Sequence, residues 1–247
     1  MTVAASLQLA PPTASTLAFA DEVGSTDPVV CVGGGTQSNG LVRAPNARAV
    51  SSPRGIVSHI PEEMIVRVHA GTTVAELAEA LATSGQHCPL DPLMPDAATI
   101  GGVLAVGLSG VRRLRYGHLR DTVLEARYVA SDGGVIKAGA PVVKNVSGYD
   151  LCRLLVGSWG TLGFLSEVVL RCTPKPQVAQ WFASSADPER LREVVYRPSS
   201  YSGTGRPLSC SSKVGRNRFV LNSVRWNASV QRKKSPRQLF RRPVGSE

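Results

Sequence analysis

The most informative segment of the chain is Val29-Val-Cys-Val-Gly-Gly-Gly-Thr-Gln-Ser-Asn-Gly40. It begins with four apolar residues that predict a short buried strand, and this strand runs directly into a glycine-rich turn. Residues without a Cβ let backbone N–H groups turn inward and approach an anion, so Gly33–Gly40 meets the physical requirements of a phosphate cradle. A tight turn without a ligand is the alternative interpretation of a triple glycine after a strand.

Two common nucleotide-binding motifs do not fit this segment. A Walker loop ends in Gly-Lys-Ser or Gly-Lys-Thr, and neither ending is present. A dinucleotide fingerprint of the Rossmann type requires glycine at the position where Ser38 follows Gly33 and Gly35. The sequence therefore disfavours a Walker site and a Rossmann site.

Composition and charge indicate the number of domains and the place of the net charge. The chain has 247 residues, 43% of them hydrophobic, which is enough for one or two domains with a buried core. The net charge of +10 arises in residues 183–247, with 14 Lys and Arg against 4 Asp and Glu, whereas residues 1–182 carry 14 of each sign. This Ser-, Arg- and Pro-rich end is predicted to be an irregular tail, and a basic nucleic-acid-binding arm is the alternative. Within the tail only Phe219–Trp226 has the composition of a strand, and we expect it to have no partner strand.

Cysteine spacing and apolar runs indicate the compartment. The five cysteines form no C-x-x-C pair, so the sequence supports neither a zinc ribbon, a thioredoxin-like motif nor a disulfide scaffold. No apolar run reaches the roughly 18 to 20 residues that a membrane span requires. Met1–Asp21 lacks the basic start of a secretory signal. We therefore expect a cytoplasmic protein without a transmembrane segment.

Short apolar runs alternate with glycine turns and a few helical stretches, a pattern typical of layered α/β or α+β folds. Met64–Val68 is predicted to be a strand whose first, third and fifth side chains share one face. Thr73 and Glu76 form a capping box, so a helix is predicted from Thr73 to the left-handed stop at Gly85. Other strands are predicted at 123–130, 135–138 and 162–171, and a short helix at 149–156.

Two further segments are rich in glycine. Ala98–Gly110 consists mainly of small residues over thirteen positions, which lets a flat ligand lie close to the main chain. The hydroxyl of Thr99 is a candidate donor to a ring or phosphate oxygen. Close packing of a helix or strand is the alternative interpretation. The third segment, Gly157–Val168, is predicted to be a loop that leads into a strand.

The order and spacing of these segments together resemble those of a known family. The chain resembles the FAD-binding domain of the vanillyl-alcohol oxidase and para-cresol methylhydroxylase (PCMH) flavoproteins, and within them the FAD-binding subunits of bacterial glycolate oxidases. The resemblance covers about residues 28–176. It is carried by Val32-Gly-Gly-Gly-Thr36, Ala70-Gly-Thr72, Leu90-Asp-Pro92, Ala98-Thr-Ile-Gly-Gly102, Gly107–Arg113, Tyr116-Gly117, Arg120-Asp121, Val143–Asp150 and Gly160-Thr-Leu-Gly163.

The resemblance implies an α+β fold, with a PCMH-type FAD-binding domain made of two α/β subdomains that hold the flavin between them. We expect an N-terminal segment at 1–27, the FAD-binding domain at 28–182 and the irregular tail at 183–247. In the family's oxidases a cap domain that follows the FAD domain supplies most substrate contacts. The residues after Pro176 are too few and of the wrong composition to build that cap.

For the site, the resemblance implies a non-covalent FAD, because Thr36 occupies what looks like the position of the histidine that links the flavin in other members. The glycine loop would wrap the pyrophosphate through main-chain N–H groups, Thr99–Gly102 would lie near the pyrophosphate and isoalloxazine, and Leu165 would offer main chain to the adenine. The implied FAD-binding residues are Gly33, Gly34, Gly35, Thr36, Gln37, Gly40, Leu41, Thr99, Gly101, Gly102, Ala105, Gly107 and Leu165.

Several polar residues have less definite roles. Arg112, Arg113 and Tyr116 are implied to border the flavin ring. Lys144 and Asn145 are candidates for an anion or ring contact, with helix capping and a surface lysine as the alternative. The histidines have neither a nucleophile motif beside them nor metal-ligand spacing, so we expect structural roles, assign no catalytic residue and expect no metal site; they are His59, His69, His87 and His118.

The resemblance implies a function as the FAD-binding oxidoreductase subunit of a glycolate oxidase-like complex. Such a subunit takes part in the oxidation of a 2-hydroxy acid, glycolate or D-lactate, to the 2-oxo acid, and reducing equivalents pass through the flavin toward partner subunits. Two alternatives stay open. One is an FAD-binding or structural subunit without its own activity, and the other is nucleic-acid association through the basic tail.

Overall fold

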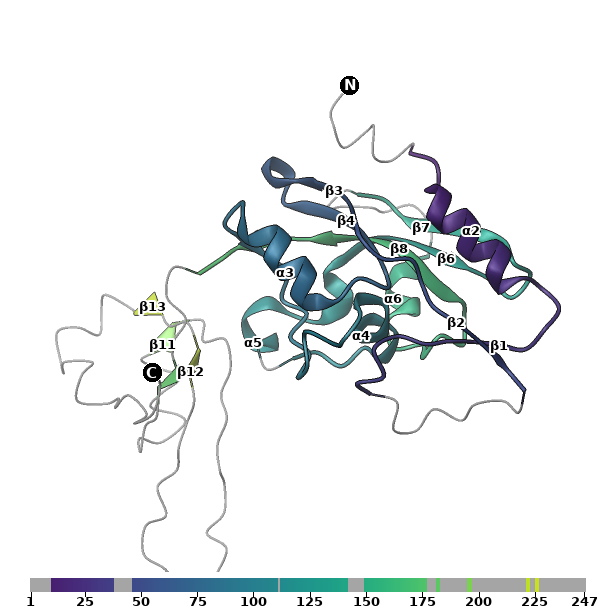
Figure 1. Cartoon of the computed structure of the whole chain (residues 1–247). Coiled ribbons are helices and arrows are strands. Elements are labelled where there is room, and N and C mark those ends of the chain that lie inside the picture. The colour runs from purple at the N-terminus through teal and green to yellow at the C-terminus, as the bar shows by residue number, and fades with distance from the viewer. Residues whose placement is uncertain are drawn as a thin grey trace, which may run out of the picture. The chain divides into compact units, whose positions relative to one another are not determined.

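The computed structural model describes residues 10–37, 46–110, 112–141 and 149–176, together with the backbone of four two-residue strands further along the chain (Figure 1). The chain divides into two compact units, residues 1–110 with 118–175 and residues 111–117 with 176–247. All three glycine-rich segments belong to the first unit. No helix in these described parts is long and apolar enough to cross a membrane.

A five-stranded antiparallel sheet forms the centre of the first unit. In spatial order its strands are β3 (Ile56–Ile60), β4 (Ile65–His69), β8 (Phe164–Arg171), β6 (Val123–Val129) and β7 (Val135–Gly139). β6 and β7 form the predicted hairpin, in which Gly133 has φ 80° and the Asp132 carboxylate accepts a hydrogen bond from the Gly134 N–H at 2.9 Å. The last of the five strands in the sequence, β8, therefore occupies the middle of the sheet.

Three helices cover one face of this sheet (Figure 1). They are α3 (Val74–Ala82), α4 (Ile100–Val106) and α6 (Leu151–Leu155). The apolar core lies between these helices and the sheet, and its fully buried side chains include Val66, Val68, Leu77, Leu81, Ile100, Leu104, Val168 and Leu170. Burial of these side chains is the main contribution to the stability of the layer.

A second layer precedes the sheet in the sequence. α2 (Ala14–Val23) begins at the N-cap Thr13, and β1 (Val29–Cys31) pairs in parallel with β2 (Arg48–Val50). The buried residues of α2 are Thr16, Phe19, Ala20 and Val23, and the last three pack in a cluster with Val50 and Val129. The structure confirms the expected α+β fold, whereas neither α2 nor β2 was predicted.

Smaller elements complete the first unit. Two short 3-10 helices, η1 (Pro61–Glu63) and η2 (Leu119–Asp121), precede β4 and β6, and β5 (Gln86–His87) pairs with β9 (Thr173–Pro174). The expected position of Met64 is wrong. Met64 closes η1 in a left-handed conformation, with φ 54°, and is 39% exposed, so β4 begins one residue later. All five residues of β4 are buried because both faces of the sheet are covered there.

The second unit contains α5 (Arg113–Tyr116) and four short strands. β10 (Trp181–Phe182) pairs with β12 (Leu221–Asn222), and β11 (Val195–Tyr196) pairs with β13 (Arg225–Trp226). The expectation that the strand-like segment in the tail has no partner is therefore wrong, because both of its strands are paired. The rest of the tail, on which the nucleic-acid alternative depends, lies outside the described residues.

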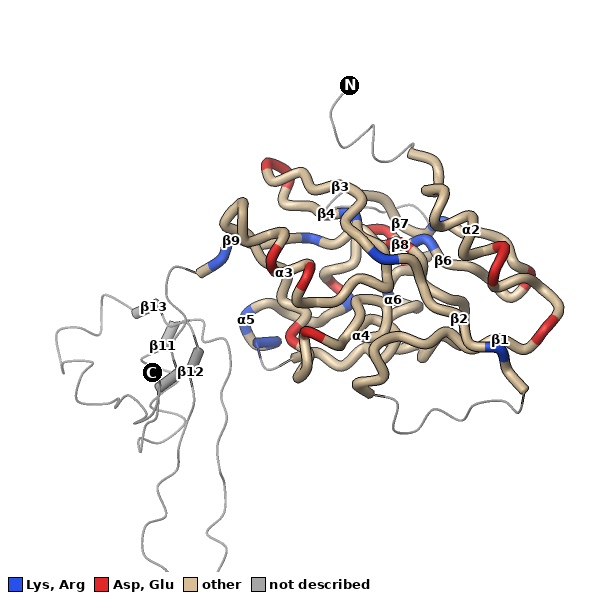
Figure 2. Tube along the Cα trace, viewed as in Figure 1, with Lys and Arg blue, Asp and Glu red and all other residues tan. Residues whose placement is uncertain are grey.

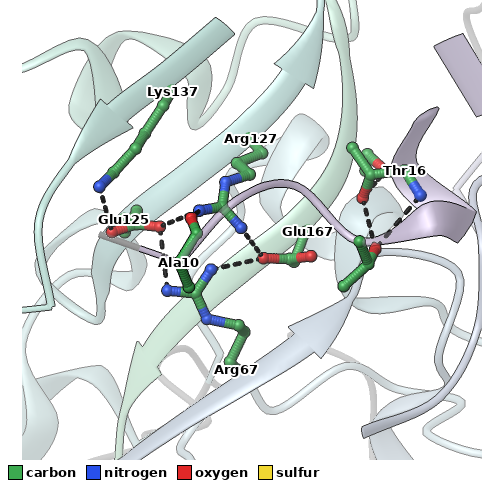
Figure 3. Close-up of polar contacts among 9 residues, drawn as sticks. Ala10, Thr16, Arg67, Glu125, Arg127, Lys137 and Glu167 are labelled. Carbon is green, nitrogen blue, oxygen red and sulfur yellow. Dashed lines mark hydrogen bonds and ion pairs between the residues drawn. The ribbon is translucent and has the colours of Figure 1, made fainter. Parts of the chain in front are cut away.

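Charged side chains are buried on the sheet face opposite the apolar core (Figure 3). Arg67, Glu125, Arg127 and Glu167 are each no more than 3% exposed. The Glu167 Oε1 accepts hydrogen bonds from Arg67 Nη1 at 2.6 Å and Arg127 Nη1 at 2.5 Å. Glu125 Oε1 lies 3.2 Å from Arg67 Nη2, and Glu125 Oε2 lies 3.4 Å from Lys137 Nζ. We refer to these five side chains as the buried ion network.

The N-terminal segment covers part of the buried ion network (Figure 3). Arg127 Nη2 donates a hydrogen bond to the carbonyl oxygen of Ala10. Beside it, the Ser166 hydroxyl donates to the Thr16 hydroxyl of α2 at 3.0 Å. A register shift in the pairing of β6 with β8 leaves Ser166 without a cross-strand partner, in a bulge next to Glu167. Residues 10–23 are thus part of the folded layer.

Charge in the described first unit is otherwise mixed. Figure 2 shows basic and acidic residues interspersed along its trace. This agrees with the balanced count of 14 basic and 14 acidic residues in positions 1–182. The trace of this unit thus shows no long run of a single charge sign in its described residues.

We expect Glu167→Gln to lower the free energy of unfolding by about 3 kcal/mol, because it leaves two buried guanidinium groups without their shared carboxylate. The control is Arg153→Ala, which removes a 53% exposed side chain paired with Asp121 at 2.8 Å and Asp150 at 3.0 Å. That variant should lose less than about 1 kcal/mol. Urea unfolding at pH 7 followed by circular dichroism measures both, and equal losses would contradict the assigned role of the network.

The predicted capping box at the start of α3 is present. Thr73 Oγ1 accepts from the Glu76 N–H at 3.3 Å, and Glu76 Oε2 accepts from the Thr73 N–H at 2.9 Å. Arg54 also donates to both carboxylate oxygens of Glu76, at 3.0 and 2.9 Å. Together the Arg54 hydrogen bonds and then the Thr73 N–H lower the pKa of Glu76 from 4.5 to about 2.

The lowered pKa of Glu76 predicts a pH-dependent contribution to stability. A carboxylate with a depressed folded-state pKa stabilises fully above its unfolded pKa, here 4.5, and loses that effect as the pH falls toward 2. Since Glu76 is on the surface, we expect Glu76→Gln to be less stable than wild type by at most about 1 kcal/mol at pH 6. This difference should shrink between pH 4.5 and 2.5 in thermal unfolding. Glu79→Gln, which removes an exposed charge from the same helix, is the control, and a constant Glu76 difference across the series would contradict the prediction.

Candidate functional site

The loop after β1 displays backbone donors. The Val32 N–H donates to the Val50 carbonyl at 2.8 Å, so the parallel pairing with β2 continues up to the first glycine. Gly33, Gly34 and Gly35 are exposed, and Gly35 has φ 67°. Within the described residues the N–H groups of Gly33 and Gly34 make no hydrogen bond. Two neighbouring donors are therefore available to an anion.

The same loop packs against the residues that start α4. A Cβ on Gly34 would lie 1.6 Å from the carbonyl oxygen of Ala97, and a Cβ on Gly33 would lie 2.5 Å from Thr99 Oγ1. Both positions therefore require glycine for the approach of the two segments, whether or not a ligand is bound. Close packing therefore accounts for both glycines, and the anion-binding interpretation stays a prediction.

The start of α4 offers one donor. The Ile100 N–H donates to the Thr72 carbonyl at 2.9 Å, the Gly101 N–H to the Ala70 carbonyl at 2.7 Å, and the Gly102 N–H to Thr99 Oγ1 at 3.2 Å. These three amides are used within the protein. The Thr99 O–H has no acceptor among the described residues, and Thr99 is half-buried beside Gly33. Of the groups expected at Thr99–Gly102, the hydroxyl is the one placed to reach a ligand.

The far end of α4 meets the third glycine segment. Gly107 ends the helix with φ 71°, and a Cβ there would lie 2.7 Å from the Gly157 Cα. The Gly157 N–H donates to the Leu104 carbonyl at 3.0 Å, and the Trp159 N–H donates to the Ala105 carbonyl at 2.9 Å. All three glycine segments therefore meet at α4, whose seven residues span about 10 Å.

Leu165 lies in the part of the third glycine segment that has joined the sheet. It belongs to the central strand β8, and its side chain is buried in the apolar core. Its carbonyl oxygen accepts a hydrogen bond from the Ser52 hydroxyl at 2.6 Å. Thr36 and Gln37 form a half-buried turn where the described part of the loop ends. Four expected residues, Gly40, Leu41, Lys144 and Asn145, lie outside the described residues.

The residues implied to border the flavin ring belong to the second unit. The guanidinium groups of Arg112 and Arg115 lie 5.4 and 5.6 Å from the centroid of the Tyr116 ring. Such distances are typical of cation–π contacts. The roles of Arg112, Arg113 and Tyr116 beside a flavin stay predictions.

Sequence reasoning did not anticipate the contacts of Ser52. Besides its hydrogen bond to Leu165, its carbonyl oxygen would lie 2.1 Å from a Cβ on Gly71, so Gly71 permits the loop after β2 to pass close to the end of β4. The Gly71 N–H donates to the Pro53 carbonyl at 2.8 Å. Gly71 belongs to a segment that the resemblance identified, whereas Ser52 stands in no recognisable motif.

The described histidines have protein partners or are buried. His59 Nε2 lies 3.0 Å from Gln86 Oε1, His87 Nε2 lies 3.1 Å from Thr173 Oγ1, and His69 is buried in β4. Burial raises the pKa of the thiols of Cys152 and Cys172 to about 12, so both stay protonated at neutral pH and are poor nucleophiles. Neither set provides a catalytic group beside the glycine loop.

The chain matches a known protein family and several characterised proteins. The family described as FAD binding domain matches residues 14–139, from the first residue of α2 to the last residue of β7. Glycolate oxidase subunit GlcE of Escherichia coli (strain K12) is 41% identical over 127 residues, which is 51% of this chain and 36% of that protein. The mitochondrial D-lactate dehydrogenase [cytochrome] of Arabidopsis thaliana is 38% identical over 153 residues, 61% of this chain and 27% of that protein.

A third relative and a solved structure extend the comparison. The D-lactate dehydrogenase of Archaeoglobus fulgidus is 36% identical over 161 residues, 64% of this chain and 36% of that protein. The chain thus spans 27% to 36% of the length of these three relatives. The structure of alkyldihydroxyacetonephosphate synthase superposes with a TM-score of 0.62 at 22% identity and covers 76% of this chain and 36% of that one. That likeness shows a shared fold.

Proposed function

Because the chain belongs to the FAD-binding domain family, we propose that it holds a dissociable FAD along α4 with the pyrophosphate on the glycine loop. The observation that carries this proposal is the pair of N–H groups on Gly33 and Gly34, which have no hydrogen-bond partner among the described residues and lie beside the hydroxyl of Thr99. Backbone donors and a hydroxyl that converge on one place favour an anion. Gly102 and Ala105, half-exposed and small, leave room for a flat group next to the helix.

We also propose roles for the other residues that the resemblance places at the FAD site. Gly35, Thr36 and Gln37 continue the loop around the pyrophosphate, and Gly101 and Gly107 act by letting α4 pack against its neighbours. Leu165 reaches the adenine only through main chain, and its carbonyl is already engaged by Ser52. Gly40 and Leu41 are proposed from the resemblance alone. Thr36 stands where a linking histidine would be, which favours a non-covalent cofactor.

We propose that the reaction is the oxidation of a 2-hydroxy acid, glycolate or D-lactate, to the 2-oxo acid. FAD, when bound, supplies the acceptor for the hydride of the α-carbon. In this proposal the glycine loop of this chain binds the cofactor, and the small side chains along α4 let it lie close to the main chain. The relatives that support this substrate class are a glycolate oxidase subunit and D-lactate dehydrogenases. Because one of them is a subunit, we propose that the electrons pass to partner subunits.

We also propose a cellular compartment for the protein and the boundaries of its domains. Cys31, Cys88, Cys152 and Cys172 are free thiols in the part of the chain that the structure describes, which supports a reducing, cytoplasmic location. We propose an FAD-binding domain at 28–182, preceded by residues 1–27 and followed by residues 183–247. An FAD-binding subunit without turnover of its own is the alternative, because the matched span covers only 27% to 36% of the relatives.

Gly35→Asn tests the cofactor site. A Cβ on Gly35 would meet no described atom within 4 Å, and asparagine tolerates its φ of 67°, so the fold should survive. The new side chain would extend into the space proposed for the pyrophosphate. We expect FAD affinity to fall by at least about tenfold, because a bound diphosphate would lose contacts with the loop. Titration of the apoprotein, followed by flavin absorption bands near about 370 and 450 nm, measures this.

Gly85→Asn is the matched control for this substitution. Gly85 has φ 64°, and a Cβ there also meets no described atom within 4 Å, but it lies beyond the end of α3. It should therefore reproduce any backbone cost and leave FAD affinity unchanged. Equal FAD affinity in both variants and wild type would contradict the placement of the pyrophosphate.

A separate experiment tests the reaction. When glycolate or D-lactate is added to the flavin-loaded protein without oxygen, we expect the absorption near about 450 nm to disappear, because the hydroxyacid reduces the flavin. L-Lactate and the 2-oxo acids are the controls and should leave the band intact. A band that no hydroxyacid bleaches would reject turnover by this chain and favour the binding-only alternative.

A further inference from the structure

Trp159 has an unusual backbone conformation for a large residue. Its φ is 56°, in the left-handed region that favours glycine, and it stands between Gly157 and Gly160, which have φ of 89° and 76°. A bulky residue pays a steric cost of about 1–2 kcal/mol in this region. Positions of this kind concentrate at functional sites, where the surrounding structure holds the conformation in place.

Hydrogen bonds hold Trp159 against α4. The Trp159 N–H donates to the Ala105 carbonyl at 2.9 Å, and the Gly157 N–H donates to the Leu104 carbonyl at 3.0 Å. The next turn is closed by the Thr161 N–H, which donates to the Ser158 carbonyl at 3.0 Å. The backbone of Trp159 is therefore fixed on both sides, and the direction in which its side chain leaves the loop is fixed with it.

The side chain of Trp159 is partly exposed. It is 43% exposed, it belongs to neither hydrophobic cluster, and its indole N–H has no hydrogen-bond partner among the described residues. Indole combines a large apolar face with one N–H donor, so a partly exposed tryptophan on a fixed loop is suited to contact with a ligand. A planar surface held at a fixed position is suited to stacking against an aromatic ring.

Trp159 lies one helix length from the proposed pyrophosphate position. Thr99, at the start of α4, adjoins Gly33, and Ala105, at the other end, adjoins Trp159. The helix between them spans about 10 Å. FAD carries an aromatic ring system on each side of its pyrophosphate, so a dinucleotide laid along α4 brings one ring to this end.

We propose that the indole of Trp159 stacks on one of the two ring systems of bound FAD and adds a binding contact to the site. This inference rests on the proposed FAD site and adds a residue to it. The shared chemistry is a flat aromatic ring, which the adenine and the isoalloxazine both supply, and the experiment separates the two.

Fluorescence tests the stacking directly. Titration of wild-type apoprotein with FAD should quench tryptophan emission, and Trp159→Phe should remove most of that FAD-dependent change. The chain has three tryptophans, so Trp181→Phe and Trp226→Phe are the matched controls and should keep it. A quench that survives in Trp159→Phe and disappears in either control would overturn the proposal.

We expect substitutions that remove the Trp159 ring to weaken FAD binding without lowering the stability of the apoprotein. Trp159→Asn keeps a residue that tolerates positive φ and removes the ring, and FAD Kd should rise about tenfold because stacking on an aromatic side chain is lost. Trp159→Gly should also weaken FAD binding while its apoprotein unfolds at a temperature no lower than wild type, since the backbone strain is relieved. Trp159→Phe should largely restore affinity. A purely structural Trp159 predicts the reverse, a lower unfolding temperature with unchanged Kd.

The ring is identified with part-ligands. Calorimetry with ADP and with FMN should show that Trp159→Asn weakens one of them and spares the other; loss for ADP assigns the adenine, and loss for FMN assigns the isoalloxazine. If Gly35→Asn loses FAD while every Trp159 variant keeps wild-type affinity, the stacking proposal fails and the FAD site stands. If wild type takes up no FAD, both are overturned.

Discussion

The contact between the glycine loop and the start of α4 is the constraint on which the arrangement depends. The carbonyl of Ala97 lies so close to Gly34 that no side chain fits between them. The same stretch of chain is tied to the end of β4, because the Ile100 and Gly101 amides donate to the carbonyls of Thr72 and Ala70. The loop after β1 and the segment that begins α4 therefore meet at backbone distance. Gly33 and Gly34 are exposed there, and their N–H groups have no hydrogen-bond partner among the described residues.

The central sheet uses its two faces differently. One face contributes Val66, Val168 and their neighbours to an apolar core under α3, α4 and α6. The other carries the buried ion network, in which Glu167 joins two arginines from strands on either side of β8. Glu167 is therefore the group that links β4, β8 and β6 through side chains on this face, and removal of one partner of such a buried pair is costly. The N-terminal segment completes it through Ala10.

Much of the fold can be predicted from short patterns in the sequence. The capping box of Thr73 and Glu76 and the hairpin turn at Asp132 depend on residues a few positions apart, and both are present. The order of the glycine segments led to the FAD-binding domain family, which the match to residues 14–139 confirms. α2 is not predicted although its buried residues follow helical spacing, because Thr16 interrupts the apolar pattern, and the hydroxyl of its partner Ser166 stands 150 positions away.

Less of the candidate site than of the fold can be predicted from the sequence. The small residues at Thr99–Gly102 predict a ligand site, which stays a prediction, and the use of the Ile100 and Gly101 amides by Thr72 and Ala70 follows from tertiary pairing that no local pattern reveals. The collision that would follow from a side chain on Gly34 has the same origin. Met64 was placed in β4 by alternation, whereas its left-handed conformation depends on the 3-10 turn before it.

The strand order of the sheet also has a consequence for synthesis of the protein on the ribosome. β4 and β6 each pair with β8 and not with each other, so two hairpins, β3 with β4 and β6 with β7, stay unjoined until residue 171 has left the exit tunnel. Until then their inner edges lack hydrogen-bond partners and the apolar face beneath the helices is uncovered. The five-stranded sheet is therefore completed only when the last of its strands in the sequence, β8, is available to join the two hairpins.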